Sequence, residues 1–326
     1  MKIYTKTISL LAAAAVFTLS SATAVTTGVV GYTSTTLPAG VGSIFAPSFI
    51  NADSVVGVIT GETSGATSSL AIANLADAAY SQTGTYPAYY LEVLNDTNGA
   101  DGLDTEGLIL DVVSNSVSAI VVGADAAAVG VNGDEQIAVR KHLTLGDIFA
   151  NATGLVAFST PVTIYNGLTE GSIETFLPDG AGGFVASDFV TPATDAIVYP
   201  GTGIVVNNSA EVVVTVNGTV KETPTQIAVY GGEVNFVGAL KPLTSFDMTS
   251  DGALDSSFVA FADPITQYSD GTLVPTNTVL TDGAGGVLEE DFVTPGTLVL
   301  SSPSAAVVIT PPGDRVYKST GTVVSN

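Results

Sequence analysis

Cysteine and tryptophan are both absent from this chain of 326 residues, and histidine occurs only once, as His142. Without cysteine the fold has no disulfide bridge, no thiolate nucleophile and no lipid anchor of the diacylglycerol type. A single histidine without cysteine also disfavours structural or catalytic zinc. A Ser-His-Asp triad could use only His142, and no Gly-x-Ser-x-Gly motif accompanies it.

Positive charge is also scarce, because 8 Lys and Arg residues face 31 Asp and Glu residues, a net charge of −23. Such a chain repels nucleic acids and anionic lipid surfaces and attracts divalent cations or basic partners. Charged residues nevertheless make up 12% of the chain and hydrophobic residues 46%, which argues against disorder. Phosphate-binding glycine motifs are absent as well.

Residues 1–24 have the pattern of a secretory signal peptide. Lys2 and Lys6 precede an apolar stretch, Ile8 to Leu19, that is too short to span a membrane, and Ala22-Thr23-Ala24 has the form of a cleavage site. Loss of the two lysines would change the net charge from −23 to −25. We therefore expect a secreted, periplasmic or cell-surface protein that starts at Val25, with no later membrane insertion and no nucleic-acid partner.

A long internal repeat organises the second half of the chain. Residues 179–192 and 282–295 both begin with Asp-Gly-Ala-Gly-Gly and end with Asp-Phe-Val-Thr-Pro, at an offset of 103 positions (282 minus 179). Matches at the same offset extend upstream to Phe158 and Phe261 and downstream to the last residues of the chain. Self-similarity at a fixed offset predicts two similar structural modules.

Composition predicts the fold class, since Val and Thr favour sheets while Gly, Asn and Asp mark turns. We expect a mostly-β, multi-domain protein with antiparallel β-sandwich or barrel modules, a tandem duplication in the C-terminal half and a few short helices. The expected division is a signal peptide at 1–24, an N-terminal mostly-β domain at 25–142, and repeat modules at 143–242 and 243–326.

Local patterns predict individual elements. Apolar and β-branched runs indicate strands at 89–94 and 136–140 and a hairpin from 108–113 to 117–122. Thr144 is expected to cap a helical turn over 145–149, and Ala-rich helical spacing predicts a helix over 68–80. Asn217-Gly218 predicts a tight hairpin turn. The two Asp-Gly-Ala-Gly-Gly stretches are read as hairpin loops, with Phe189-Val190 and Phe292-Val293 in the core.

Three segments resemble a paralogous family of secreted verrucomicrobial proteins that has no assigned function. In that family a YYLEV strand leads to a DIVSNT hairpin and then to a TLGDIF segment. Here YYLEV stands at 89–93, DVVSNS at 111–116 and TLGDIF at 144–149. The match covers about half the chain and departs at the acidic loop 95–107 and in the lack of Trp. The resemblance implies a surface or periplasmic origin and no particular activity.

The acidic loop contains the best candidate for a metal site, and Ca²⁺ is the candidate cofactor. Ca²⁺ takes six to eight oxygen ligands from carboxylates, amides and carbonyls, and this loop offers Asp96, Asn98, Asp101, Asp104 and Glu106. The spacing is one residue off the EF-hand pattern, and no helices are expected on either side. The competing interpretation is a solvated acidic loop with Asx turns. Ordinary turn chemistry also explains the repeated Asp-Gly loops and the nearby Asp188 and Asp291.

No catalytic constellation or organic cofactor site stands out, so we do not expect an enzyme. The first functional hypothesis is an exported structural or interaction protein of a surface, matrix or appendage, possessing cation-dependent contacts with itself or with related proteins. The alternative is a polysaccharide-binding protein, for which Tyr165 and Tyr268 are the candidate contacts. A glycoside hydrolase that uses a carboxylate pair is the third hypothesis.

Overall fold

The computed structural model describes residues 28–96, 103–167, 169–243, 245–249, 254, 257–269, 272–300 and 302–321. The expected signal peptide lies outside these ranges. The described chain is mostly β-structure in antiparallel sheets, with one short α-helix, α1 (Leu145–Phe149), and one 3-10 turn at Ala127–Val129. This confirms the predicted fold class. In the described sheets of three or more strands the first and last strands do not pair with each other, so these sheets are open and do not close into a barrel.

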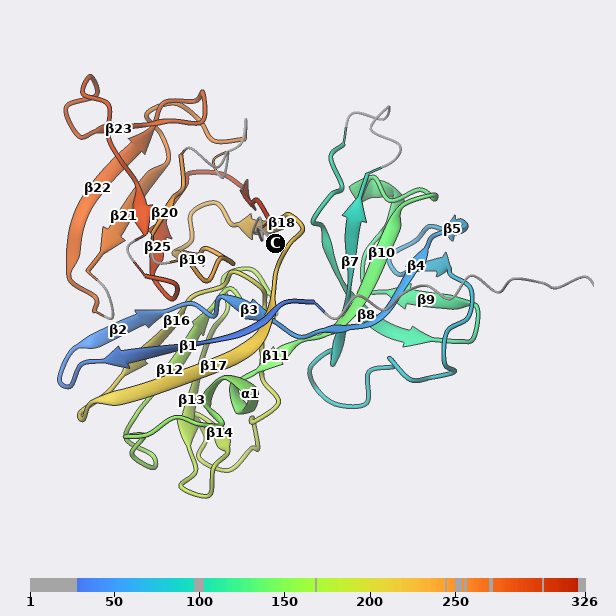
Figure 1. The fold of residues 1–326 in the computed structure, drawn as a ribbon, viewed down its shortest axis with the longest axis horizontal. Coiled ribbons are helices and arrows are strands. Elements are labelled where there is room, and N and C mark those ends of the chain that lie inside the picture. Colours follow the sequence, from blue (N-terminus) through green and yellow to red (C-terminus); the bar gives the residue numbers. More distant parts are fainter. Residues whose placement is uncertain are drawn as a thin grey trace, which may run out of the picture.

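A seven-stranded sheet forms a separate unit, here called the middle sheet, on the right of Figure 1. Its strand order is β4-β10-β7-β8-β9-β6-β5, and its core contains apolar side chains such as Leu70, Leu91 and Ile137. Its strands are β4 (Asp53–Val58), β5 (Gly61–Thr63), β6 (Ser68–Ala71), β7 (Tyr89–Asn95), β8 (Ile109–Asn115), β9 (Ala119–Val122) and β10 (Gln136–Lys141).

The second unit, module 1, is a sandwich of a five-stranded sheet, β14-β13-β12-β16-β2, and a smaller sheet, β1-β17-β3. Its core combines side chains of both sheets and of α1, including Phe45, Phe149 and Val214. The strands are β1 (Val30–Leu37), β2 (Gly42–Phe45), β3 (Phe49–Ile50), β11 (Leu143–Thr144), β12 (Val162–Tyr165), β13 (Ile173–Pro178), β14 (Phe184–Ala186), β15 (Ile197–Val198), β16 (Ile204–Asn207) and β17 (Val212–Val220).

The third unit, module 2, has a five-stranded sheet, β23-β22-β21-β25-β19, and the pairs β18-β26 and β20-β24. Its own core includes Phe258, Ile265 and Tyr317. The strands are β18 (Thr225–Val229), β19 (Asn235–Gly238), β20 (Phe246–Asp247), β21 (Pro264–Tyr268), β22 (Pro275–Thr281), β23 (Val287–Glu289), β24 (Val299–Leu300), β25 (Ala306–Ile309) and β26 (Arg315–Ser319).

The registers of the two five-stranded sheets correspond strand by strand. Val162 pairs with Phe176 in module 1 and Ile265 with Val279 in module 2, a shift of 103 for both partners (265 minus 162 and 279 minus 176). The first strands correspond at a different offset. Ile44 pairs with Val205 and Phe236 with Val308, so β2 and β19 differ by 192 positions (236 minus 44).

These strands change the expected division of the chain. Residues 30–50 were assigned to the unit 25–142, yet β1, β2 and β3 hydrogen-bond to β16 and β17 of module 1. Likewise β18 and β19 precede the expected boundary at 242 but pair with β26 and β25 of module 2. The chain thus leaves module 1 after β3, builds the middle sheet, and returns at β11. The entry and exit strands, β4 and β10, are paired neighbours.

The modules contact each other through equivalent faces. Ile44 and Val205 of module 1 pack against Phe236 and Val308 of module 2, which occupy the same positions in their own sheets. The backbone contacts correspond too, because Ala46 N–H donates to Ser304 C=O at 2.9 Å and Gly238 N–H donates to Gly201 C=O at 2.9 Å. Because equivalent residues of the two modules contact each other, the module junction has an approximate two-fold symmetry.

Most of the expected local elements are present. β7, β10 and the β8–β9 hairpin match their predicted segments, and the two Asp-Gly-Ala-Gly-Gly stretches connect the paired strands β13–β14 and β22–β23. Thr144 caps α1, since its hydroxyl accepts from Asp147 N–H at 3.1 Å and the Asp147 carboxylate accepts from Thr144 N–H at 3.1 Å. This reciprocal pair is a capping box.

The helix predicted over residues 68–80 is wrong. Residues 68–71 form β6 between β5 and β9, and turns with positive φ at Asn74 and Ala78 follow. Ser68, Leu70 and Ile72 are buried while Ser69 and Ala71 between them are only partly so, which is the alternation of a strand. Sheet pairing outweighed the alanine content that favours a helix.

The hairpin turn predicted at Asn217-Gly218 is also wrong, because both residues lie inside the nine-residue strand β17. Asn217 pairs with Tyr32 and Gly218 with Gly31 of β1, which comes from the far N-terminal part of the chain. A distant partner strand therefore took up the whole segment. The glycine serves another purpose here, since β3, the neighbouring strand, comes so close that a Cβ atom on Gly218 would contact it.

Candidate interaction surface

The strongest candidate site is a pair of equivalent loops, here called the end loops, which consist of residues 187–192 in module 1 and 290–295 in module 2. In the first loop the Asp188 carboxylate accepts from Val190 N–H at 2.9 Å, Thr191 N–H at 2.8 Å and the Thr191 hydroxyl at 2.6 Å. Asp291 makes the corresponding three contacts with Val293 and Thr294 at 2.9, 2.7 and 2.5 Å. Each loop is therefore held in the same shape by one aspartate.

These hydrogen bonds have an electrostatic signature. Thr191 and the neighbouring backbone N–H groups lower the pKa of Asp188 from 3.8 to about 2. The pKa of Asp291 is lowered in the same way, by Thr294 first and then by Val293. Hydrogen bonds to a carboxylate favour its charged form. Both aspartates are therefore ionised and serve to shape the loop.

The end loops expose large apolar side chains. Phe189 is 58% exposed and Val190 is 77% exposed, and Phe292 and Val293 are 54% and 79% exposed. The prediction that these residues lie in the core is wrong. The strands β14 and β23 stop before them, and the aspartate-centred turn then directs both side chains outward.

A second phenylalanine completes each exposed cluster. The rings of Phe158 and Phe189 lie 6.2 Å apart, and the rings of Phe261 and Phe292 lie 6.1 Å apart. All four phenylalanines have positive φ, between 55° and 65°. Left-handed backbone is costly for a bulky residue, and such strain is concentrated at functional sites. Here it occurs at two phenylalanines in each module, at equivalent positions, and all four rings are exposed.

The two end loops lie on opposite sides of the two-module pair. In each five-stranded sheet the end loop follows the edge strand, β14 or β23, and the module junction uses the other edge strand, β2 or β19. Figure 1 shows this arrangement, with β14 at the bottom, β23 at the upper left and the junction between them. The molecule therefore presents the same apolar feature in two directions.

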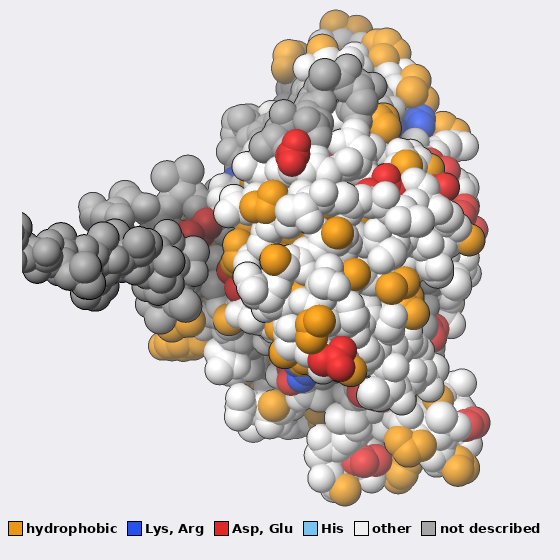
Figure 2. All heavy atoms as spheres, turned by 90° about the vertical axis from the view of Figure 1, so that its right-hand side faces the viewer, with side chains coloured by type: hydrophobic (Ala, Val, Ile, Leu, Met, Phe, Trp, Pro, Cys, Tyr) orange, Lys and Arg blue, Asp and Glu red, His pale blue; other side chains and the backbone are white. Residues whose placement is uncertain are grey.

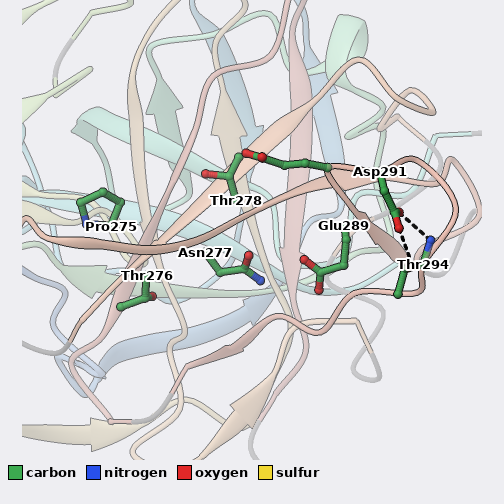
Figure 3. Close-up of a pocket in the computed structure, with 8 residues that line it drawn as sticks. Pro275, Thr276, Asn277, Thr278, Glu289, Asp291 and Thr294 are labelled. Atoms are coloured by element: carbon green, nitrogen blue, oxygen red, sulfur yellow. Dashed lines mark hydrogen bonds between the residues drawn. The ribbon is translucent and has the colours of Figure 1, made fainter.

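A shallow groove of about 620 Å³ adjoins the end loop of module 2 (Figure 3). Asn277 of β22 and Glu289 of β23 reach toward the same space, and the Asp291–Thr294 hydrogen bonds close one side. The equivalent positions in module 1 carry Glu174 and Ala186, so each module has one carboxylate at this pair of positions but on a different strand. The apolar cluster is shared by both modules, whereas Glu290, which corresponds to Ser187, adds a second acidic residue to the glutamate side of the groove in module 2.

No protein-family model, curated protein or solved structure matches this chain. The resemblance to the secreted verrucomicrobial family therefore stays an expectation from the sequence.

The predicted calcium loop falls only partly within the described residues, because Asn98 and Asp101 lie outside them. Asp96 accepts from Thr105 N–H at 3.2 Å, and Asp104 forms an ion pair with Lys318 and accepts from Glu106 N–H at 3.2 Å. Within the described ranges no group of three or more acidic or histidine side chains is placed to hold a metal ion. The calcium site stays a prediction.

The other candidate residues from the sequence lie at the module junction or in tight turns. Tyr165 and Tyr268 are partly buried at the module junction, where the Tyr165 ring lies 4.8 Å from that of Phe236. Asp179 accepts from Ala181 and Gly183 N–H groups at 2.7 and 2.9 Å, and Asp282 makes the same contacts in its loop. These two aspartates shape their turns.

Among the described residues on the face that Figure 2 draws, no comparable feature stands out. Hydrophobic side chains are scattered over this side of the molecule, acidic ones are interspersed and basic ones are rare. Isolated apolar side chains on a surface need no functional explanation. In the described part of the chain no helix is long and apolar enough to cross a membrane.

Proposed function

We propose that this protein is an exported, non-catalytic interaction protein of a cell surface, extracellular matrix or appendage, and that its two end loops link partners together. The observation that carries the proposal is the duplicated exposed phenylalanine pair, held rigidly by Asp188 and Asp291 at opposite sides of the molecule. Exposed apolar patches on well-ordered loops are typical of interaction sites. The sequence pattern of a signal peptide supports export.

Two equivalent sites give such a protein a specific property, which is bridging. A molecule with one loop can only bind, whereas a molecule with two loops can connect one partner to the next. The partners that the sequence favours are further copies of this chain or related surface proteins. Each exported copy carries a net charge of −25, which is the −23 of the whole chain without the two positive charges of Lys2 and Lys6. Contacts between copies therefore require screening, and divalent cations such as Ca²⁺ would supply it.

The test is assembly of the mature protein, measured by sedimentation velocity and light scattering over a range of concentrations. Samples contain either Ca²⁺ or a chelator at equal ionic strength. We expect concentration-dependent chains with Ca²⁺, small capped complexes for the single variants Val190→Asp and Val293→Asp, and monomers for the double variant. Val56→Asp on β4, which replaces another exposed valine away from the loops, should assemble like the unmodified protein.

A monomeric unmodified protein under every condition, or a double variant that assembles normally, would show that the end loops do not link copies of the chain. Substituting Asp101 and Asp104 with Asn tests the cation separately. If Ca²⁺ acts through the acidic loop, the Ca²⁺-dependent rise in melting temperature disappears in this variant. If it only screens charge, Mg²⁺ at equal ionic strength has the same effect as Ca²⁺.

Polysaccharide binding is the second candidate, and the groove of module 2 favours it. Asn277 and Glu289 provide amide and carboxylate groups in a groove that adjoins the end loop of module 2. The partly buried Tyr165 and Tyr268 are less suitable contacts than this groove. Glycan-array binding that is lost in Glu289→Ala but kept in Glu174→Ala would support this function. A carboxylate-pair hydrolase is the remaining alternative, and a broad screen of polysaccharide cleavage tests it.

A further inference from the structure

A pocket of about 340 Å³ lies where the three units meet, apart from the end loops. The middle sheet contributes Asp111, module 1 contributes Tyr199, and module 2 contributes Tyr230 together with apolar residues such as Ile227 and Val316. Small-molecule sites occur preferentially at such domain interfaces and have volumes from about 300 Å³ upward. The pocket is thus of the right size and place for a small ligand.

Asp111 belongs to a hydrogen-bonded network in the wall of the pocket. Its carboxylate accepts from the Tyr199 hydroxyl at 2.5 Å and lies 3.0 Å from His142 Nε2. His142 is fully buried between the rings of Tyr90 and Tyr199, whose centroids are 4.7 and 5.1 Å from its own. The Asp111 side chain itself remains 30% exposed. Two of its roughly four lone-pair positions are used, which leaves the others for a ligand.

The amide donors of the pocket are already committed. The Asn166 side-chain amide donates one hydrogen bond to Val234 C=O at 3.1 Å and one to Asn235 Oδ1 at 2.9 Å. Both hydrogens of the Gln226 amide are used as well, on the carbonyls of Asp104 and Glu106 at 2.5 and 3.0 Å. The Tyr199 hydroxyl donates to Asp111, and no Lys or Arg is among the described lining residues. The hydroxyls of Thr202 and Tyr230 can turn either way, so acceptors are in excess.

The charges and aromatic rings around the pocket also favour a positively charged ligand. Burial raises the pKa of Tyr199, and the adjacent Asp111 raises it further. Burial, Glu170, Asp314 and Asp111 raise the pKa of Tyr230 in that order, so both rings remain neutral phenols in a negative field. Aromatic faces beside a carboxylate attract cations through the ring quadrupole. An ammonium group has three donors and no acceptor, which complements a site rich in acceptors.

We propose that this junction pocket binds a small organic amine in its protonated form, with the ammonium group on the Asp111 carboxylate and its alkyl chain against Ile227 and Val316. Tyr199 and Tyr230 line the site beside the cation. The oxygens of a sugar are both donors and acceptors and would find few free donors here, and Ca²⁺ would find only one carboxylate among the described lining residues.

The experiment is isothermal titration calorimetry and saturation-transfer NMR with butylammonium, with its neutral isostere butanol, and with glucose, at millimolar concentration. The blocked amino acid N-acetyl-lysine methylamide is added to distinguish a free amine from a lysine side chain of a partner. We expect butylammonium to bind and the two neutral compounds not to bind. Asp111→Asn and Tyr230→Leu should each weaken binding about tenfold.

Asp77→Asn is the charge-matched control, since Asp77 is exposed and lies outside the pocket, and it should bind like the unmodified protein. If Asp111→Asn fails to fold because either His142 or Tyr199 loses its acceptor oxygen, Tyr230→Leu still decides the question. Equal signals for butylammonium and butanol, no signal for butylammonium, or full binding by Tyr230→Leu would each overturn the proposal. Stronger binding of the lysine compound would identify a partner protein as the source of the amine.

Discussion

At the scale of single residues, the side chain of one aspartate holds each end loop in shape through its hydrogen bonds. Asp188 holds two N–H groups and one hydroxyl, and Asp291 does the same in module 2. The exposed Phe189 and Phe292 could not keep their positive φ if the turn were loose, because that conformation is unfavourable without a surrounding constraint. The aspartates are therefore what makes the apolar loops rigid.

Acid should loosen the end loops. The folded pKa of Asp188, about 2, lies below its ordinary value of 3.8. A depressed pKa means that the carboxylate stabilises the loop above the ordinary value and that this contribution is lost as pH falls through the folded pKa. We expect amide protection factors at Val190 and Thr191 to fall between pH 4 and pH 2, as measured by hydrogen exchange with NMR detection.

Asp188→Asn is the control for this prediction, because an amide oxygen can accept the same N–H groups but does not titrate in this range. Its protection factors at Val190 and Thr191 should not change between pH 4 and pH 2. The Asp291 loop of the same variant, which still titrates, serves as an internal reference. Identical pH profiles for Val190 in both proteins would rule out this account of the loop.

At the scale of elements, β17 shows how a distant strand can override a local turn signal. β1 pairs with β17 along eight consecutive positions, from Val30–Thr219 to Leu37–Val212. β3 pairs with the end of β17 and passes close to Gly218. A Cβ atom at this position would lie 2.7 Å from Ile50 C=O and 2.9 Å from Phe49 Cβ. Glycine is needed here for close approach between strands.

Gly218→Ala should accordingly destabilise module 1. The added methyl group must displace the backbone of β3, and overpacking of this kind costs about 1–3 kcal/mol. Urea unfolding measures the loss. Gly61→Ala in β5 is the matched control, because its nearest new contact would be Ala71 Cβ at 3.9 Å, an ordinary van der Waals distance. A Gly218→Ala protein as stable as the Gly61→Ala protein would contradict the close approach.

At the scale of the whole molecule, equivalent faces and a buried ionic network hold the three units together. Glu92 of the middle sheet is fully buried and forms an ion pair with Arg140, whose Nε lies 2.7 Å from the Glu92 carboxylate. Glu92 also forms an ion pair with Lys221, which lies in the segment between β17 and β18. Burial lowers the pKa of Lys221, and the nearby Glu92 opposes this change. Removal of one partner from such a network leaves an uncompensated buried charge, which is strongly destabilising.

The module junction makes a sharper prediction, because Ala46 and Gly238 are equivalent positions that face each other across it. A Cβ atom on Gly238 would lie 2.2 Å from Ala46 Cβ. Gly238→Ala should therefore destabilise the protein by about 1–3 kcal/mol in urea unfolding. Adding Ala46→Gly removes the facing methyl group and should recover most of the loss. If the two substitutions are simply additive, with no recovery, the two positions do not share this contact.

The sequence by itself determined the features that depend on neighbouring residues or on direct self-comparison. The predominance of strands, the duplicated segments, the β8–β9 hairpin and the helix cap at Thr144 all follow from local patterns, and the described structure contains them. The repeat also contained the signal for the end loops, since both copies keep Asp-Phe-Val-Thr-Pro. Hydrophobicity predicts these residues in the core, but it does not specify whether a side chain points inward or toward solvent.

Only the tertiary structure decided which distant segments meet. Residues 30–50 pair with β16 and β17 although the whole middle sheet separates them in sequence, and this pairing turned the expected Asn217-Gly218 hairpin into a strand. The junction pocket likewise combines Asp111, Tyr199 and Tyr230 from three units. Backbone hydrogen bonding and burial can be satisfied by partners at any sequence separation, so local patterns do not specify them. The exposure of Phe189 and Phe292 was decided in the same way, by where their strands end and what packs behind them.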